Sequence, residues 1–98
     1  MPTIFDREHF HHMTAGDAAL QTEVIALFRA QISALSEALR GADWRGPAHT
    51  LKGSARGIGL AALAAACERA EAEGGGAALE DVHAEIARAM TALDATFG

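Results

Sequence analysis

Apolar residues recur every three or four positions along most of the chain, which is the spacing of one face of an α-helix. The pattern predicts a short helix over 4–13 and four longer helices over about 20–40, 44–58, 60–73 and 79–97. No segment alternates polar and apolar residues for long enough to predict a strand. Alanine is plentiful and valine and isoleucine are few, which also favours helix over strand.

Short segments connect these predicted helices, so sequential helices should pack as antiparallel neighbours. We therefore expect an all-α fold, an antiparallel up-and-down four-helix bundle with an additional short N-terminal helix. The length of 98 residues allows one compact domain and not two, so residues 1–98 should form a single domain.

Each predicted helix has an apolar stripe that should face the core. The stripes are Ile4, Phe5, Phe10 and Met13; Leu20, Val24, Leu27, Phe28, Ile32, Leu35 and Leu39; Trp44, Ala48, Leu51, Ala55 and Ile58; Leu60, Leu63, Ala64, Cys67 and Ala70; and Leu79, Val82, Ile86, Met90, Leu93 and Phe97. Asp6 and Asp43 are candidate N-caps, and Gly41, Gly57, Gly59 and the run 74–76 are candidate helix ends.

Charge and composition argue against several classes of function. The 13 acidic and 8 basic residues leave a formal net charge of −5, which disfavours binding to the phosphates of nucleic acid. No run of about 18 apolar residues predicts a membrane span, and the opening residues lack the pattern of a secretory signal. The single cysteine, Cys67, cannot form an internal disulfide, so we expect a reducing compartment, the cytoplasm.

The predicted helix over 44–58 carries a polar face besides its apolar stripe. His49, Lys52, Gly53 and Arg56 lie at spacings of three, one and three, so they share one side of this helix. Lys52 is the only lysine in the chain. Glycine inside a helix costs about 1 kcal/mol relative to alanine, and a side chain at position 53 would lean over His49. We infer that Gly53 keeps the approach to the imidazole open.

This polar face suits phosphoryl chemistry. A neutral imidazole is a nucleophile near pH 7, and a cation one helical turn away would balance the charge of a phosphoryl group. The chain has no glycine-rich nucleotide loop followed by a suitable lysine, and it is too short to include an ATP-binding domain. The residues of this face therefore support phosphoryl chemistry, and the chain lacks the parts of a complete kinase.

The run from His49 to Gly59, HTLKGSARGIG, resembles the motif of histidine-containing phosphotransfer (Hpt) domains of two-component phosphorelays. That motif has His, any residue, Leu or Phe, Lys, Gly, two small residues, two variable ones, an aliphatic residue and Gly. The likeness continues through Leu60, Leu63 and Cys67-Glu68. With the predicted helices it covers essentially the whole chain, although only residues 48–71 resemble a motif.

The resemblance implies a phosphocarrier with no autonomous kinase activity, rather than an enzyme. It also implies roles for the residues of the motif. His49 would be phosphorylated by the phosphoaspartate of one receiver domain and would pass the phosphoryl group to another. Lys52 would support the phosphoryl oxygens, and Gly53 would leave space for the phosphoryl group and the receiver. Glu71 matches, by spacing alone, a position at which family members often place Gln or Glu to hydrogen-bond the imidazole.

Two further positions are candidates for contact with a partner. Ser54 is one of the two small residues of the motif, and Arg56 occupies one of its variable positions. Arg56 would help a docked receiver or would merely keep this face soluble.

The resemblance also implies the partners and cofactors. Response-regulator receiver domains and a hybrid histidine kinase would be the partners of a monomer, and neither nucleic acid nor a membrane would be bound. We expect no cofactor on this chain and Mg²⁺ on the partner receiver domain. We also expect no metal site, because no Cys or carboxylate near His9 and His12 completes a recognisable ligand set.

Three alternatives stay open on the sequence. The chain would be a helical interaction module without phosphorylation if the motif were coincidental. The dimerisation hairpin of a histidine kinase fits less well, because that family has an acidic residue directly after its histidine and a proline downstream, whereas Thr50 follows His49 here. The chain would also fit the phosphoacceptor domain of a larger hybrid or chemotaxis kinase.

Overall fold

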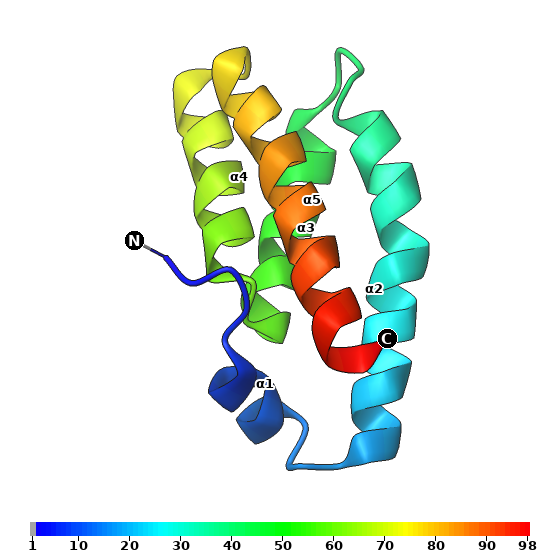
Figure 1. The fold of residues 1–98 in the computed structure, drawn as a ribbon. Helices are drawn as coiled ribbons and strands as arrows, with labels where there is room; N and C mark the ends of the chain where they lie inside the picture. The colour runs from blue at the N-terminus through cyan, green and yellow to red at the C-terminus, as the bar shows by residue number, and fades with distance from the viewer. Residues whose placement is uncertain (1) are drawn as a thin grey trace.

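Five helices account for most of the computed structural model, which describes residues 2–98. Only Met1 of the expected domain lies outside the described residues. The helices are α1 (Arg7–Met13), α2 (Ala18–Ala38), α3 (Arg45–Ile58), α4 (Ala61–Glu73) and α5 (Ala77–Phe97), as Figure 1 shows. Residues 2–98 contain no strand, so the prediction of an all-α fold is confirmed.

The four long helices alternate in direction along the chain, as expected for an up-and-down bundle (Figure 1). Helix α4 packs most closely against α3 and α5. Helix α2 is joined to α5 by an ion pair of 2.8 Å between Arg29 and Asp94, and Ser36 Oγ lies 3.4 Å from His83 Nδ1. No helix within residues 2–98 is long and apolar enough to cross a membrane.

The core confirms the predicted stripes of α3 and α4 and corrects that of α2. From Ala48 to Ile58 and from Leu60 to Ala70, the stripe residues are buried. On α2, Ile25 is buried although the predicted stripe omits it, whereas Leu20 and Leu27 are 40% and 62% exposed. The physical reason is that α2 presents a narrower face to the bundle than its run of apolar residues suggests.

The caps and helix ends also follow the sequence in part. Asp6 caps α1 by accepting a hydrogen bond from His9 N, and Gly59 ends α3 in the left-handed conformation. Asp43 is not the N-cap of α3. That position belongs to Trp44, which makes no capping hydrogen bond with its side chain. The indole of Trp44 packs at Gly75, where a Cβ atom would lie 3.1 Å from Trp44 Cζ2.

Two other glycines do not end helices where the pattern placed them. Helix α2 stops at Ala38, before Gly41, and α3 continues through Gly57 to Ile58. The glycine run does end α4, because Gly74 is its C-cap in the left-handed conformation.

The N-terminal segment is anchored where α3 meets α4. Asp6 N donates to Gly59 O at 2.8 Å, and Ala62 N donates to Thr3 O at 2.8 Å. A Cβ atom at Gly59 would lie 2.8 Å from Asp6 O, so this contact also requires glycine.

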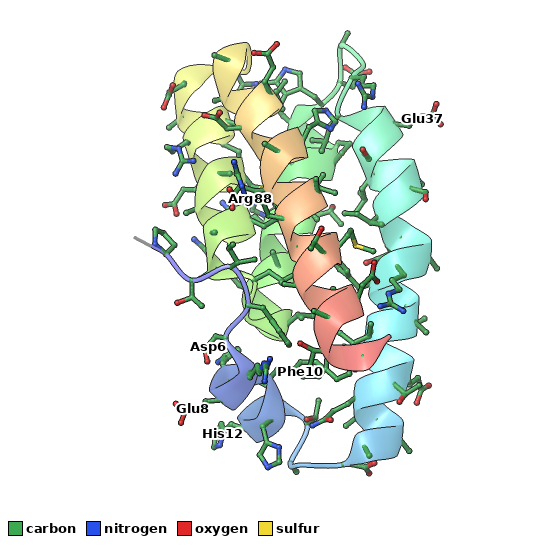
Figure 2. The ribbon with its side chains drawn as sticks, viewed as in Figure 1. Asp6, Glu8, Phe10, His12, Glu37 and Arg88 are labelled. Carbon is green, nitrogen blue, oxygen red and sulfur yellow. The ribbon has the colours of Figure 1, made fainter. Side chains whose placement is uncertain are left out.

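Aromatic packing holds α1 against the end of α5. The rings of Phe5, Phe10 and Phe97 lie with centroids 5.6–6.0 Å apart, in tilted or edge-on pairs. Figure 2 shows Phe10 on the side of α1 that faces the bundle, with Glu8 and His12 turned away from it. This arrangement places α1 beside the ends of α2 and α3.

Candidate functional site

Helix α3 has two faces with different surroundings. The stripe from Ala48 to Ile58 is buried in the core, while the side chain of His49 is 72% exposed. Lys52 is much less exposed than His49, with which it shares the predicted polar face. Its side chain is only 15% exposed, because it reaches across to α4.

Glu71 of α4 connects the histidine and the lysine. Its Oε1 lies 2.9 Å from Lys52 Nζ, and its Oε2 lies 3.5 Å from His49 Nδ1. Oε1 is buried and finds no aligned hydrogen-bond partner within residues 2–98, so its contact with Lys52 is an ion pair. The structure thus brings together His49, Lys52 and Glu71, which the sequence proposed from two different helices.

The lysine keeps the Glu71 carboxyl ionised. Contact with the Lys52 ammonium lowers the pKa of this carboxyl, partial burial raises it, and His49 lowers it again; the net shift is downward. An ionised carboxylate beside Nδ1 favours the imidazole tautomer that carries its proton on that nitrogen. The other ring nitrogen, Nε2, then has a free lone pair.

A second ion pair lies beside the first between the same two helices. Arg56 Nη2 of α3 is 3.1 Å from Glu68 Oε2 of α4, and both side chains are more than half exposed. Glu68 precedes Glu71 by three residues, so the two carboxylates share one side of α4. Arg56 therefore pairs within the domain, and an exposed pair of this kind contributes about 0–1 kcal/mol to stability.

The helix surface beside His49 carries no side chain at Gly53. A Cβ atom at Gly53 would meet nothing within 4 Å, so no neighbouring helix of this molecule requires glycine there. The same holds for Gly46 and Gly57, which flank the site at spacings that put them on the same side as His49. The main chain of α3 is thus open to approach around the imidazole.

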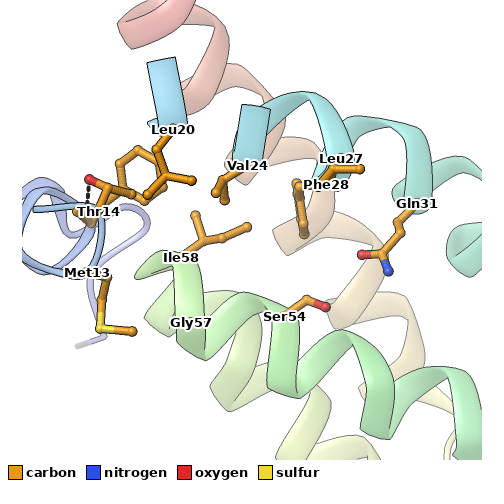
Figure 3. A pocket seen from close by; sticks show the side chains of 11 residues that line it. Met13, Thr14, Leu20, Val24, Leu27, Phe28, Gln31, Ser54, Gly57 and Ile58 are labelled. Carbon is orange, nitrogen blue, oxygen red and sulfur yellow. Dashed lines mark hydrogen bonds between the residues drawn. The ribbon is translucent and has the colours of Figure 1, made fainter. Parts of the chain in front are cut away.

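A groove of about 450 Å³ adjoins this open surface on the side away from α4, between α1, α2 and α3. Figure 3 shows Ser54 of α3 facing Phe28 and Gln31 of α2 across it, with Gly57 further along α3 towards Met13. At 100° per residue, His49 and Gly53 lie on α3 between the groove side and the α4 side. Ser54 and Arg56, the two predicted partner contacts, therefore lie on opposite sides of His49.

Cys67 is buried near this site and is unsuited to be a second nucleophile. Burial raises the pKa of its thiol to about 11, the negative charge of Glu71 raises it as well, and Lys52 opposes them. The thiol is therefore neutral near pH 7, as expected for a small apolar core residue.

The described residues offer no obvious place for a metal ion. Within residues 2–98, no three His, Cys, Asp or Glu side chains gather in a way that could hold one. His9 is partly buried, and its Cδ2 would lie 3.3 Å from a Cβ atom at Gly59.

A comparison of the sequence with protein-family models identifies the family of the chain. The model of the Hpt domain matches residues 19–96, which span α2 to α5 and include His49, Lys52 and Glu71. The chain belongs to the Hpt domain family. The match begins after α1, so the N-terminal helix of this Hpt domain lies outside the matched region. No curated protein and no solved structure matches the chain.

Sequence reasoning missed the contacts that Arg45 and Glu68 make in this Hpt domain. Arg45 Nη1 donates to the main-chain carbonyl oxygen of Glu71 at 3.2 Å, and Glu68 pairs with Arg56. The signal for Glu68 was its spacing of three from Glu71. The contact of Arg45 depends on how α3 packs against the end of α4, which no sequence pattern specifies.

Replacing Lys52 with methionine should raise the pKa of the Glu71 carboxyl towards its ordinary value, because the lysine is the largest cause of the lowered pKa. A carboxyl with a lowered folded-state pKa adds stability above its unfolded pKa, and this is lost as pH falls through the folded-state pKa. The variant should therefore lose stability at pH 7 and little below both pKa values. Carbon-13 NMR titration of Glu71 would measure the pKa. Denaturant unfolding at pH 7 and at a pH below the folded and unfolded pKa values would measure the loss of stability.

Arg56→Met is the matched control, because it removes the neighbouring ion pair between α3 and α4 and leaves Lys52 in place. An equal rise of the Glu71 pKa in both variants would contradict the assignment of the shift to Lys52.

Proposed function

We propose that this Hpt domain carries a phosphoryl group on His49 between receiver domains of a phosphorelay. The observation that carries the proposal is the arrangement of an exposed imidazole with a carboxylate at Nδ1 and a lysine on the same carboxylate. The match to the Hpt domain model supports it, since that match covers both helices of the site. His49 is the nucleophile, Lys52 the cation, and Glu71 the group that orients the imidazole.

In the proposed transfer the phosphoryl group moves directly from oxygen to nitrogen, and no proton has to be transferred. His49 Nε2 attacks the phosphorus of the receiver's phosphoaspartate, so an N–P bond forms as the O–P bond breaks. The aspartate carboxylate leaves with the electron pair of that bond. Nδ1 keeps its proton, and the Glu71 carboxylate stabilises the positive charge that the ring acquires.

Lys52 supplies the positive charge that the phosphoryl oxygens need. It follows His49 by three residues, about one helical turn, and it is held within the site by Glu71. Loading of His49 would place a dianionic group beside a lysine that already has a carboxylate partner. Lys52 would then be shared between the two anions.

The receiver would dock on α3 around His49 and extend over the adjoining groove. The groove is largely apolar, and its rim includes Leu27 and Met13, which are 62% and 57% exposed. Its α3 wall at Ser54 and Gly57 continues the open surface at Gly53. A receiver that covers His49 closely would bury these apolar side chains, while Arg56 and Glu68 would lie at the polar edge of the contact.

The division of work between the partners follows from what this chain carries. The Hpt domain would contribute the nucleophile, one cation and the docking surface, and the receiver would contribute Mg²⁺ and most catalytic groups. We propose a monomer that works with response-regulator receivers and a hybrid histidine kinase in the cytoplasm, and that has no kinase activity of its own.

Replacing His49 with glutamine should abolish phosphoryl loading without unfolding the domain, because the side chain is mostly exposed and lies outside the core. The test incubates each protein with a labelled phosphorylated receiver and with phosphoramidate as a small donor, then measures acid-labile protein-bound phosphate. The matched control is His12→Gln, which removes another exposed histidine. Acid-labile loading of the His49→Gln variant would remove His49 as the acceptor.

Replacing Gly53 with glutamate should keep the fold and slow transfer from a receiver by roughly 10²-fold, the effect of displacing reacting groups by about 1 Å. The Cβ atom has room within this molecule, so the defect would arise only when the partner approaches. Circular dichroism and transfer kinetics would measure the two effects, with Ala84→Glu on the exposed side of α5 as the control. Unaltered kinetics would remove the access role of Gly53.

Replacing Leu27 with aspartate should weaken receiver docking about tenfold, as expected for losing one buried leucine contact. Phosphoramidate loading should be unchanged, because Leu27 belongs to the groove and not to the His49 site. Docking is measured as the receiver concentration that gives half of the maximal transfer rate, in the variant and in the unaltered protein. Ile4→Asp is the control, since Ile4 is an exposed apolar residue near Ala87 and Thr91 of α5. Equal effects of both variants would argue against docking at the groove.

A further inference from the structure

Three residues on successive turns of α3 contact the same residue of α4. His49 and Lys52 lie at the carboxylate of Glu71, and Arg45 donates to its main-chain carbonyl oxygen at 3.2 Å. Arg45 precedes His49 by four residues and Lys52 by seven, so the three lie along one side of α3. Arg45 has no role in the mechanism above.

The carbonyl that Arg45 contacts has no partner from its own helix end. The last four carbonyl groups of an α-helix lack intrahelical donors. In α4, Gly74 N and Gly75 N both bond to Ala70 O, at 3.0 and 3.1 Å, so neither is directed to Glu71 O. The guanidinium of Arg45 supplies the missing hydrogen bond.

Arg45 is held in this position by its neighbours. Its guanidinium carbon lies 4.7 Å from the centroid of the Trp44 ring, within the range of a cation–π contact. The Trp44 ring packs at Gly75, and a Cβ atom at Gly74 would lie 3.8 Å from Arg45 Nη2. The start of α3 is therefore packed against the end of α4, at positions three and four residues beyond Glu71.

The charge of Arg45 suits the end of α4 and not the start of α3. A cation in the first turn of a helix opposes the helix dipole, whereas a cation at a helix C-terminus is favoured by it. Arg45 is the first residue of α3, and no acidic residue lies in that turn. With respect to the helix dipoles, the charge of Arg45 is thus unfavourable at the start of α3 and favourable at the end of α4.

We propose that Arg45 is a positioning residue for the phosphotransfer site. By fixing the main chain at Glu71 relative to α3, Arg45 keeps the carboxylate of Glu71 at Nδ1 of His49. This inference rests on the proposed function, in which Glu71 holds the proton on Nδ1 so that Nε2 attacks. Arg45 acts through Glu71 and does not contact the reacting atoms.

The test compares the histidine tautomer in Arg45→Met with that in the unaltered protein, by nitrogen-15 NMR of the His49 ring at alkaline pH. The unaltered protein should be mostly the Nδ1–H tautomer. Arg45→Met should move His49 towards the mixture of a free imidazole, in the direction that Glu71→Ala defines. Phosphoramidate loading should fall about fivefold, the factor that corresponds to one hydrogen bond of typical strength.

Arg29→Gln is the matched control, because it removes an ion pair between α2 and α5, away from the site. A change of stability without a tautomer shift is expected there. Should Arg45→Met fail to fold, Arg45→Ala, which also lacks a side-chain donor, provides the same comparison. A His49 tautomer in either folded Arg45 variant equal to that of the unaltered protein would overturn the proposal. The tautomer is measured without phosphoryl transfer, so this result is separate from a failure of His49 to be phosphorylated.

Discussion

The close packing of α3 against α4 is the constraint on which the site depends. Both helices line their buried faces with small side chains, such as Ala48 and Ala55 on α3 and Ala66 and Ala70 on α4. Small residues allow two helix axes to approach closely, and here they bring a carboxylate of α4 within 2.9 Å of a lysine on α3. A larger residue in this interface would move Glu71 away from His49 without touching either residue. The chemistry at the surface is therefore determined by side-chain volumes in the core.

The electrostatics of the site follow from the single lysine. In the unphosphorylated domain, Lys52 neutralises Glu71, and Glu71 is in turn available to Nδ1 of His49. A phosphoryl group on Nε2 would add negative charge on the side of the ring remote from Glu71. Because Lys52 is only 15% exposed, solvent would screen its interactions less than those of Arg56, whose side chain is 56% exposed. One partly buried cation can thus influence both the resting imidazole and the loaded one, and an exposed arginine at position 56 is less suited to this role.

Much of the fold could be predicted from sequence, because the apolar spacing in α3 and α4 repeats along helices that are buried on one face. The spacing failed on α2, where Leu27 continues the apolar pattern but is exposed, since periodicity records which residues are apolar and not how wide a face is covered. The motif located His49, Lys52 and Gly53, and spacing alone brought Glu71 to them. The ion pair of Lys52 with Glu71 and the bond from Arg45 to the Glu71 carbonyl could not be predicted. They depend on the angle and register of two helices, which the apolar pattern does not specify.

Glycines of α3 and an exposed leucine of α2, none of which stabilises the isolated domain, lie on one side of it. Glycine within a helix costs about 1 kcal/mol relative to alanine, and α3 contains Gly46, Gly53 and Gly57, at none of which a Cβ atom would meet a neighbour. The exposed Leu27 adds an apolar surface that water disfavours. Small domains have only about 5–15 kcal/mol of stability, so this loss matters, above all at Gly53, because Gly46 and Gly57 lie in the first and last turns of α3. Packing inside this molecule does not explain that loss, whereas a partner that approaches the α3 main chain and covers the groove would.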